Sequence, residues 1–182
     1  MKTKGIIAGV VIVLIAGLGA GYWLGAKKPV KAPAKTNGGP INYNELLSEL
    51  TRRVNENPND WDLHARLGDV YFGTGKFNEA VVHYRKAVEL NPGDIDSYND
   101  LGLAYHYTGN TAEGLKYIND GIKKDPNYQR IWLTRGFLSY AIGNRDEAVA
   151  SWQKTISINP DSQVARAANE YLAELKKAPH DK

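Results

Sequence analysis

Cysteine is absent from the 182 residues of this chain. Its absence excludes disulfide bonds, thiolate nucleophiles, cysteine-ligated zinc or iron–sulfur centres and covalent c-type haem attachment. Histidine is also scarce, and no two of the four histidines lie three or four positions apart. No helix face therefore presents a histidine pair for a transition metal, and we expect neither a metal site nor another cofactor. The four are His64, His83, His106 and His180.

Sequence motifs that carry catalysis are missing as well. There is no nucleophile elbow, no phosphate-binding Walker loop and no dinucleotide-binding glycine pattern. The carboxylates are scattered along helical segments with lysines and arginines between them, as on a solvated surface. The sequence therefore predicts a protein that is not an enzyme and that has no catalytic residues.

Acidic residues are absent from residues 1–40, which contain six lysines. The other 17 of the 23 basic side chains and all 20 acidic ones lie in residues 41–182, which gives that part a net charge of −3. The pI near 8.9 is thus a property of the N-terminal segment. A mildly acidic folded part argues against binding to a phosphate backbone, so we expect no nucleic-acid partner.

An uncharged run of 22 residues extends from Gly5 to Ala26. As a helix it covers roughly 33 Å, which is enough for a hydrocarbon core of about 30 Å. We therefore expect residues 1–26 to form a transmembrane anchor that contacts the lipid bilayer through residues 5–26. A cleaved signal peptide is the alternative, although this run is longer than the usual apolar region and lacks a small residue at Leu24. Glycines spaced four apart within the run permit close helix pairing, and hence a homo-oligomer.

The expected location is a bacterial cell membrane that the chain crosses once. Lysines flank the apolar run on both sides, so the side that carries the folded domain stays open. The slightly larger number of lysines after the run favours the cytoplasm, whereas a basic start before an apolar run resembles an export signal and favours the periplasm, our preferred side. Residues 27–40 are rich in proline, glycine and lysine and are expected to be a linker.

One constant spacing, a period of about 34 residues, organises the rest of the chain. Three residue series keep this spacing, which indicates a repeat protein. They are the pairs Asn57-Pro58, Asn91-Pro92, Asp125-Pro126 and Asn159-Pro160, the glycines Gly68, Gly102 and Gly136, and the glycines Gly75, Gly109 and Gly143.

Each unit contains two apolar stripes at helical spacing, separated by a glycine turn and ended by the proline pair. The aspartates Asp60, Asp94 and Asp161 follow the prolines, where we expect them to cap the next helix. The expected division is a leading half-repeat helix at 41–60, repeats at 61–94, 95–128 and 129–162, and a C-terminal capping helix with a tail at 163–182.

These units resemble the tetratricopeptide repeat (TPR) family. The first carries the Leu-Gly-x-x-Tyr, Gly-x-Phe-x-x-Ala and terminal proline elements at Leu67, Gly68, Tyr71, Gly75, Phe77, Ala80 and Pro92. The resemblance implies an all-α, right-handed superhelical solenoid of antiparallel helix pairs. It also implies that the first helices of the repeats line a concave groove that binds a protein or an extended peptide.

The groove positions of the family fall on a largely aromatic and apolar set of residues, which suits an apolar or aromatic peptide. The basic clamp with which some members hold a terminal carboxylate is missing, since Asp62 and Asp69 stand near its expected place. Arg130 is expected to fix one acidic group of the ligand. The alternative for Leu103 and Phe137 is packing between adjacent helices. The expected groove residues are Phe72, Asn99, Leu103, His106, Tyr107, Arg130, Leu133, Phe137 and Tyr140.

A few residues depart from the repeat pattern. Gly114 and Gly121 replace alanine in the second repeat, which weakens a helix unless close packing compensates. Arg135 replaces leucine in the third repeat, where we expect a buried cation with an acidic partner, the alternative being a helix rotated towards the groove.

The functional expectation is a membrane-anchored adaptor that concentrates a protein or peptide partner at a bacterial membrane. A narrower resemblance, to the repeat domain of bacterial c-type cytochrome maturation factors, rests on residues 45–72 and 151–175 and implies a role in complex assembly. The alternative function is a self-associating structural scaffold without a peptide ligand.

Overall fold

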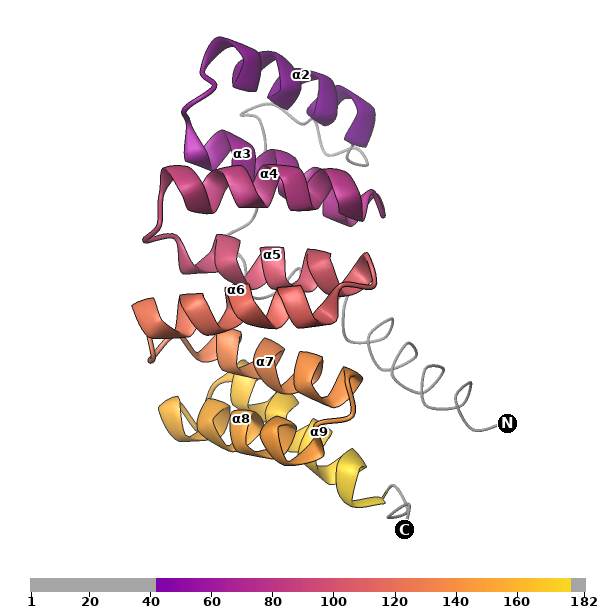
Figure 1. The fold of residues 1–182 in the computed structure, drawn as a ribbon, viewed down its shortest axis with the longest axis vertical. Helices are drawn as coiled ribbons and strands as arrows, with labels where there is room; N and C mark the ends of the chain where they lie inside the picture. The colour runs from indigo at the N-terminus through magenta and orange to yellow at the C-terminus, as the bar shows by residue number, and fades with distance from the viewer. Residues whose placement is uncertain (1–41, 178–182) are drawn as a thin grey trace, which may run out of the picture. The chain divides into compact units, whose positions relative to one another are not determined.

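The computed structural model describes residues 42–177, and every regular element in this range is an α-helix (Figure 1). The predicted anchor at 1–26 and linker at 27–40 lie outside the described residues. Among the helices that are described, none is both long and apolar enough to cross a membrane. The helices are α2 (Tyr43–Glu56), α3 (Trp61–Gly73), α4 (Phe77–Leu90), α5 (Ile95–Tyr107), α6 (Thr111–Lys124), α7 (Gln129–Ala141), α8 (Arg145–Ile158) and α9 (Gln163–Lys177).

Consecutive helices pack as pairs. α3 packs on α4, α5 on α6 and α7 on α8, while α2 covers α3 at one end of the stack and α9 covers α8 at the other. These are the helix pairs of a tetratricopeptide fold, and each lies inside one repeat unit of the sequence. The end helices are needed because a repeat buries its apolar face only against its neighbours.

Within each pair the chain reverses at a glycine with positive φ. Gly75, Gly109 and Gly143 have φ of 76°, 84° and 86°. An L-residue with a side chain is strained in this left-handed region, so glycine is the residue that permits the tight turn. This explains why the second glycine series recurs once in every repeat.

The first glycine series provides close contact between the two helices of a repeat. A Cβ atom added at Gly68 or Gly102 lies less than 3.0 Å from Tyr84 or Ile118, respectively, on the partner helix. Gly136 is in the same situation against Trp152. Each bulky partner follows its glycine at the same spacing along the chain, so a glycine and a large side chain form one packing unit in every repeat.

The glycines that replace alanine in α6 are also packing residues. A Cβ atom at Gly114 lies 2.5 Å from the carbonyl oxygen of Gly102, and one at Gly121 collides with the side chains of Ile131 and Tyr98. Close packing therefore compensates for the low helix propensity of both glycines, which is the condition under which we expected them to be tolerated.

Only one of the three predicted aspartate caps is present. The carboxylate of Asp60 accepts from the backbone N–H groups of Asp62 and Leu63. Asp94 stands at the N-cap position of α5, but its carboxylate accepts from the Ser97 hydroxyl in place of a side-chain cap bond to the helix backbone. Instead of Asp161, Ser162 precedes α9 and accepts from the N–H group of Ala165 at 2.9 Å.

The helices form two rows. We call α3, α5 and α7 the inner helices and α4, α6 and α8 the outer helices. α5 contacts α7 and α7 contacts α9, whereas the outer helices of the described chain make no comparable contacts with one another. The stack of residues 42–177 therefore curves with the inner row on its concave side.

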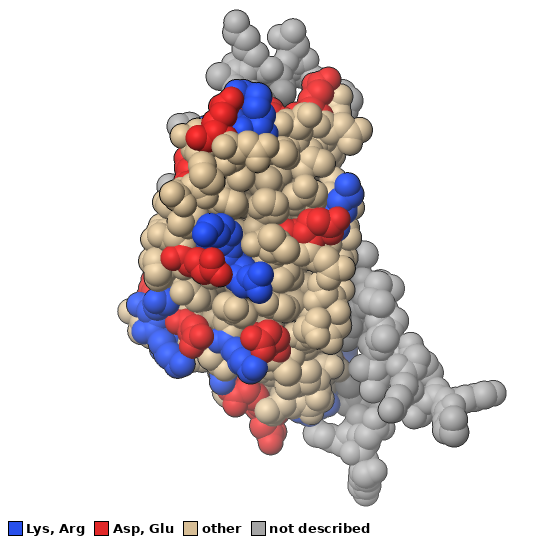
Figure 2. Space-filling view, turned by 45° about the horizontal axis from the view of Figure 1, so that its top comes forward, with Lys and Arg blue, Asp and Glu red and all other residues tan. Residues whose placement is uncertain are grey.

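The outer helices carry paired charges. Lys116 bonds to Glu113 and Lys123 to Asp120, one turn apart on α6. Figure 2 shows basic and acidic side chains next to one another across the exposed face. Such exposed pairs contribute little stability and keep the surface soluble. We therefore place the candidate site on the inner row.

Candidate functional site

Aromatic rings gather where the inner helices α3 and α5 end. Phe72 and Tyr107 lie in the last turns of α3 and α5, His106 precedes Tyr107, and Phe77 begins α4. We call these four residues, Phe72, Phe77, His106 and Tyr107, the aromatic rim. The glycine turn after α3 is responsible for the arrangement, since it returns the chain and places Phe77 beside Phe72.

The rings of the aromatic rim are in mutual contact. The centroids of Phe77 and Tyr107 lie 4.7 Å apart in a stacked arrangement, and Phe72 meets both rings edge-on at 5.2 and 5.4 Å. His106 meets Tyr107 edge-on at 5.3 Å. Such contacts hold the rings in place, so a ligand meets a preformed surface and orders few side chains on binding.

The aromatic rim is accessible and uncharged. Tyr107 is 37% exposed, which makes it one of the few large apolar side chains on the described surface. Burial lowers the pKa of His106, so its imidazole is neutral at physiological pH. Burial also raises the pKa of Tyr107, whose hydroxyl therefore stays protonated. The rim can bind apolar or aromatic side chains and offers a hydroxyl at its edge.

The other predicted groove residues lie at different depths. Leu103 and Tyr140 are half-buried, and Tyr140 lies beside Trp152 with 6.1 Å between ring centroids. Asn99, Leu133 and Phe137 are buried, and the Phe137 ring contacts His106 at 5.1 Å. Phe137 thus packs between adjacent helices, as the alternative for this residue proposed. The role of these five residues in partner binding stays a prediction.

Arg130 lies on the inner helix α7 as predicted, but its guanidinium has partners within the domain. Its guanidinium bonds to Asp96 and Asp100 at 2.9 Å each, across the boundary between the second and third repeats. Burial opposes its charge, but the carboxylates of Asp100 and Asp96 and the hydroxyl of Tyr128 outweigh this and raise the pKa of Arg130. The charge of Arg130 is therefore neutralised within the domain, so an acidic ligand group gains little from it.

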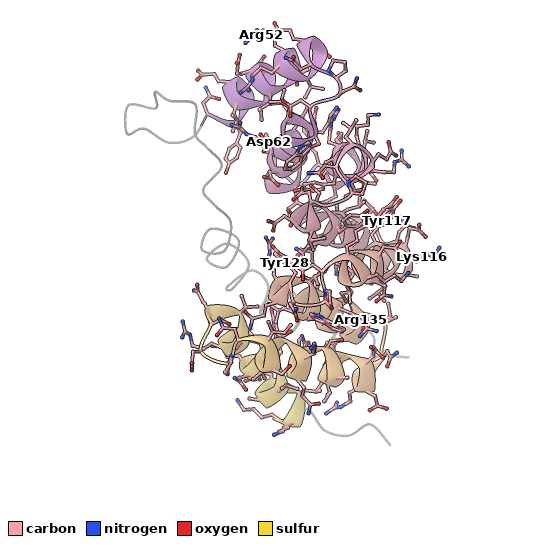
Figure 3. All side chains as sticks on the ribbon, turned by 90° about the vertical axis from the view of Figure 1, so that its left-hand side faces the viewer. Arg52, Asp62, Lys116, Tyr117, Tyr128 and Arg135 are labelled. Carbon is pink, nitrogen blue, oxygen red and sulfur yellow. The ribbon has the colours of Figure 1, made fainter. Side chains whose placement is uncertain are left out.

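Carboxylates line the opposite edge of the inner row, where the helices begin. We call Asp62, Asp96 and Asp100 the acidic rim. The Tyr128 hydroxyl donates to Asp96, and Figure 3 shows Tyr128 and Asp62 on the same side of the stack, away from Lys116 and Tyr117. None of the inner helices contains a lysine. The inner row thus has an acidic rim and an aromatic rim.

Arg135 has the predicted structural role. Its guanidinium pairs with Glu147 and bonds to the side chains of Asn119 at 2.9 Å and Ser151 at 3.0 Å. It also lies over the ring of Trp132. These partners join α7 to the outer helices α6 and α8, so the alternative of a helix rotated towards the groove is wrong.

A histidine pair between α3 and α4 was not predicted. The Nδ1 atoms of His64 and His83 lie 3.1 Å apart, and the Nε2 atom of His64 lies 3.1 Å from the carbonyl oxygen of Pro58. Since a carbonyl only accepts, Nε2–H of His64 donates to Pro58, and Nδ1 of His64 accepts from Nδ1–H of His83. Within the described residues no group of three or more potential ligands could hold a metal ion.

The histidine pair predicts a stability that depends on pH. Burial and the neighbouring His64 lower the pKa of His83 to about 4, compared with 6.5 in the unfolded chain. The unfolded chain therefore binds a proton first, so stability is full above pH 6.5 and falls as the pH drops towards 4. We expect the melting temperature of the wild type to fall more between pH 7.5 and 4.5 than that of His83→Gln. Equal falls in the two proteins would contradict the assignment.

Comparison with known proteins agrees with the architecture. Residues 68–109 match the family described as TPR repeat, and residues 95–128 match the one described as Tetratricopeptide repeat. The search of curated proteins found no match to this sequence.

Solved structures with the same fold include a crystal structure of MamA, with a TM-score of 0.62 and 22% identity over 72% of this chain and 79% of that one. The Arabidopsis OM64 TPR domain has a TM-score of 0.57 and 18% identity over 63% of this chain and 95% of that domain. The first TPR of Spaghetti (RPAP3), bound to the HSP90 peptide SRMEEVD, has a TM-score of 0.56 and 19% identity over 64% and 92% of the two chains.

Proposed function

We propose that this chain acts as a membrane-anchored adaptor that binds a protein or peptide partner. Its described part is a tetratricopeptide repeat domain, a non-catalytic module typical of protein–protein interaction. The observation that carries the proposal is the aromatic rim. Its rings are held in contact with one another on the inner row, yet Tyr107 remains accessible at 37% exposure. Rigid aromatic residues of this kind dominate binding energies at protein interfaces.

Anchoring strengthens the proposal. The apolar run at Gly5–Ala26 would hold the domain at a bacterial membrane, where a high effective concentration of a membrane-associated partner makes modest affinity sufficient. Assembly of c-type cytochromes is a setting that stays a prediction, as does the preference for the periplasmic side. Self-association of the repeat domains is the alternative function.

The ligand of the RPAP3 structure helps to define what this domain binds. That ligand, SRMEEVD, carries three acidic side chains. In this chain Arg130 is paired with two carboxylates, and the exposed carboxylates of Asp62 and Asp96 are the accessible charges beside it. Acidic peptides of that type would be repelled here, so the partner must differ in charge.

Site-specific photo-crosslinking in cells tests the adaptor function. A photoreactive residue at position 107 should capture a distinct partner, whereas one at position 116 on the outer helix α6 should not. Tyr107→Ala should weaken binding of the captured partner about tenfold or more, because an aromatic anchor at an interface contributes roughly 2 kcal/mol. Its helical content should stay unchanged. Capture of a second copy of this chain, or equal capture from both positions, would favour the scaffold instead.

A further inference from the structure

We propose that the acidic rim binds lysine or arginine side chains of an extended partner segment, while apolar side chains of the same segment pack on the aromatic rim. This inference rests on the proposed function and specifies the chemistry of the partner. A groove lined by basic residues would prefer acidic ligands, whereas this groove would prefer basic ones.

Accessible carboxylates are the first observation. The side chains of Asp62 and Asp96 are 58% and 48% exposed. Asp62 has one ion-pair contact, with Arg66 at 3.9 Å, and the bonds that Asp96 receives from Tyr128 and Arg130 both end on its Oδ1 atom. Oδ2 of Asp96 therefore remains able to accept from a ligand.

Asn99 is the second, independent observation. Its side chain is fully buried, and its Nδ2–H group donates to Oδ1 of Asp100 at 3.2 Å, which places the amide group next to the acidic rim. Its Oδ1 atom is buried without a hydrogen-bond partner among the described residues. A buried acceptor without a donor is costly. The two exposed carboxylates offer acceptors to a ligand, and the unsatisfied Oδ1 atom of Asn99 shows that the interior beside them also has more acceptors than donors. The groups that this edge lacks are therefore donors.

Charge complementarity then identifies the partner. The accessible charges at this edge are the carboxylates of Asp62 and Asp96, at 58% and 48% exposure. Their partners Arg66 and Arg130 are only 17% and 12% exposed, so a ligand meets mainly negative charge. An ammonium or guanidinium group supplies both the charge and the donors that this side of the groove requires. In an extended chain successive side chains point to opposite sides. A segment that alternates basic and apolar residues therefore addresses both rims at once.

Fluorescence anisotropy with the full chain tests the inference. The probe is a labelled eight-residue peptide that alternates lysine with leucine, and its counterpart alternates glutamate with leucine. We expect the lysine peptide to bind at least about tenfold more tightly. Asp62→Asn and Asp96→Asn should each weaken it about three- to fivefold, and added salt should weaken it further.

Asp120→Asn is the matched control, because it removes the same charge from the outer helix α6, where Asp120 is 51% exposed. An equal loss with Asp120→Asn, or equal binding of the two peptides, would overturn the inference. Asp96→Asn also removes a partner of Arg130 and could therefore lower the melting temperature. If it does, the peptide affinity of Asp62→Asn decides the test. If position 107 captures a partner but the lysine peptide does not bind, the inference fails while the adaptor function stands.

Discussion

Gly114→Ala is expected to lower the free energy of unfolding by about 2 kcal/mol, although alanine is the better helix former. The new methyl group would lie 2.5 Å from the carbonyl oxygen of Gly102, and a backbone atom cannot rotate away as a flexible side chain does. Overpacking of this kind costs up to about 3 kcal/mol, which exceeds the gain of about 1 kcal/mol in helix propensity. Thermal unfolding followed by circular dichroism should show a fall of roughly 6–8 °C.

Gly93→Ala is the control for this prediction. Gly93 lies in the loop before α5, where a Cβ atom meets only the side-chain oxygen of Asn91 at 3.3 Å. That variant should melt within about 2 °C of the wild type. A Gly114→Ala protein that melts at or above the wild-type temperature would mean that α5 and α6 separate easily, contrary to the packing described.

Ala80→Asp should have the larger effect and abolish folding of the first repeat. Ala80 is completely buried on α4, at the repeat position that Gly114 and Ala148 occupy in the next two units. An aspartate there is both too large and charged without a partner, which costs more than about 4 kcal/mol. We expect loss of a cooperative melting transition, or a midpoint in urea lowered by more than half.

Ala150→Asp serves as its control, since Ala150 is exposed on the outer helix α8 and the substitution is chemically identical. This variant should lose less than about 1 kcal/mol, mainly through helix propensity. If both variants unfold at the same urea concentration, the interior of the first repeat is not the one described.

The repeat period was enough to predict the helical pairs, their turns and the end helices. Glycine and proline act locally, so Gly75 or Pro92 determines where a helix ends without knowledge of its neighbours. Side-chain partners were harder to predict because they depend on contacts between helices. Asp94 was expected to cap α5 through its carboxylate, but this carboxylate accepts a hydrogen bond from the hydroxyl of Ser97, one turn away.

The sequence predicted the position of the candidate site better than the interactions that its side chains make. Tyr107 and His106 lie on the inner row as the family pattern implies, but Arg130 is neutralised by Asp96 and Asp100 of the preceding repeat. Asp96 occupies in the second repeat the position that Arg130 occupies in the third, so the ion pairs could have been anticipated from register. The contact between His64 and His83 spans the two helices of one repeat, and a search along single helix faces misses it.

The packing of glycine against a large side chain has a mechanical consequence. Tyr84, Ile118 and Trp152 each fill the gap left by a glycine, so the two helices of a repeat cannot slide past one another. Between the second and third repeats, by contrast, charged contacts such as Arg130 with Asp96 add to the apolar packing. The two helices of a repeat therefore move together as one unit, and bending of the domain is concentrated at the boundaries between repeats. Because the side chain of Arg130 is only 12% exposed, salt screens this ion pair weakly, and the boundary that it spans should keep its stiffness at high ionic strength.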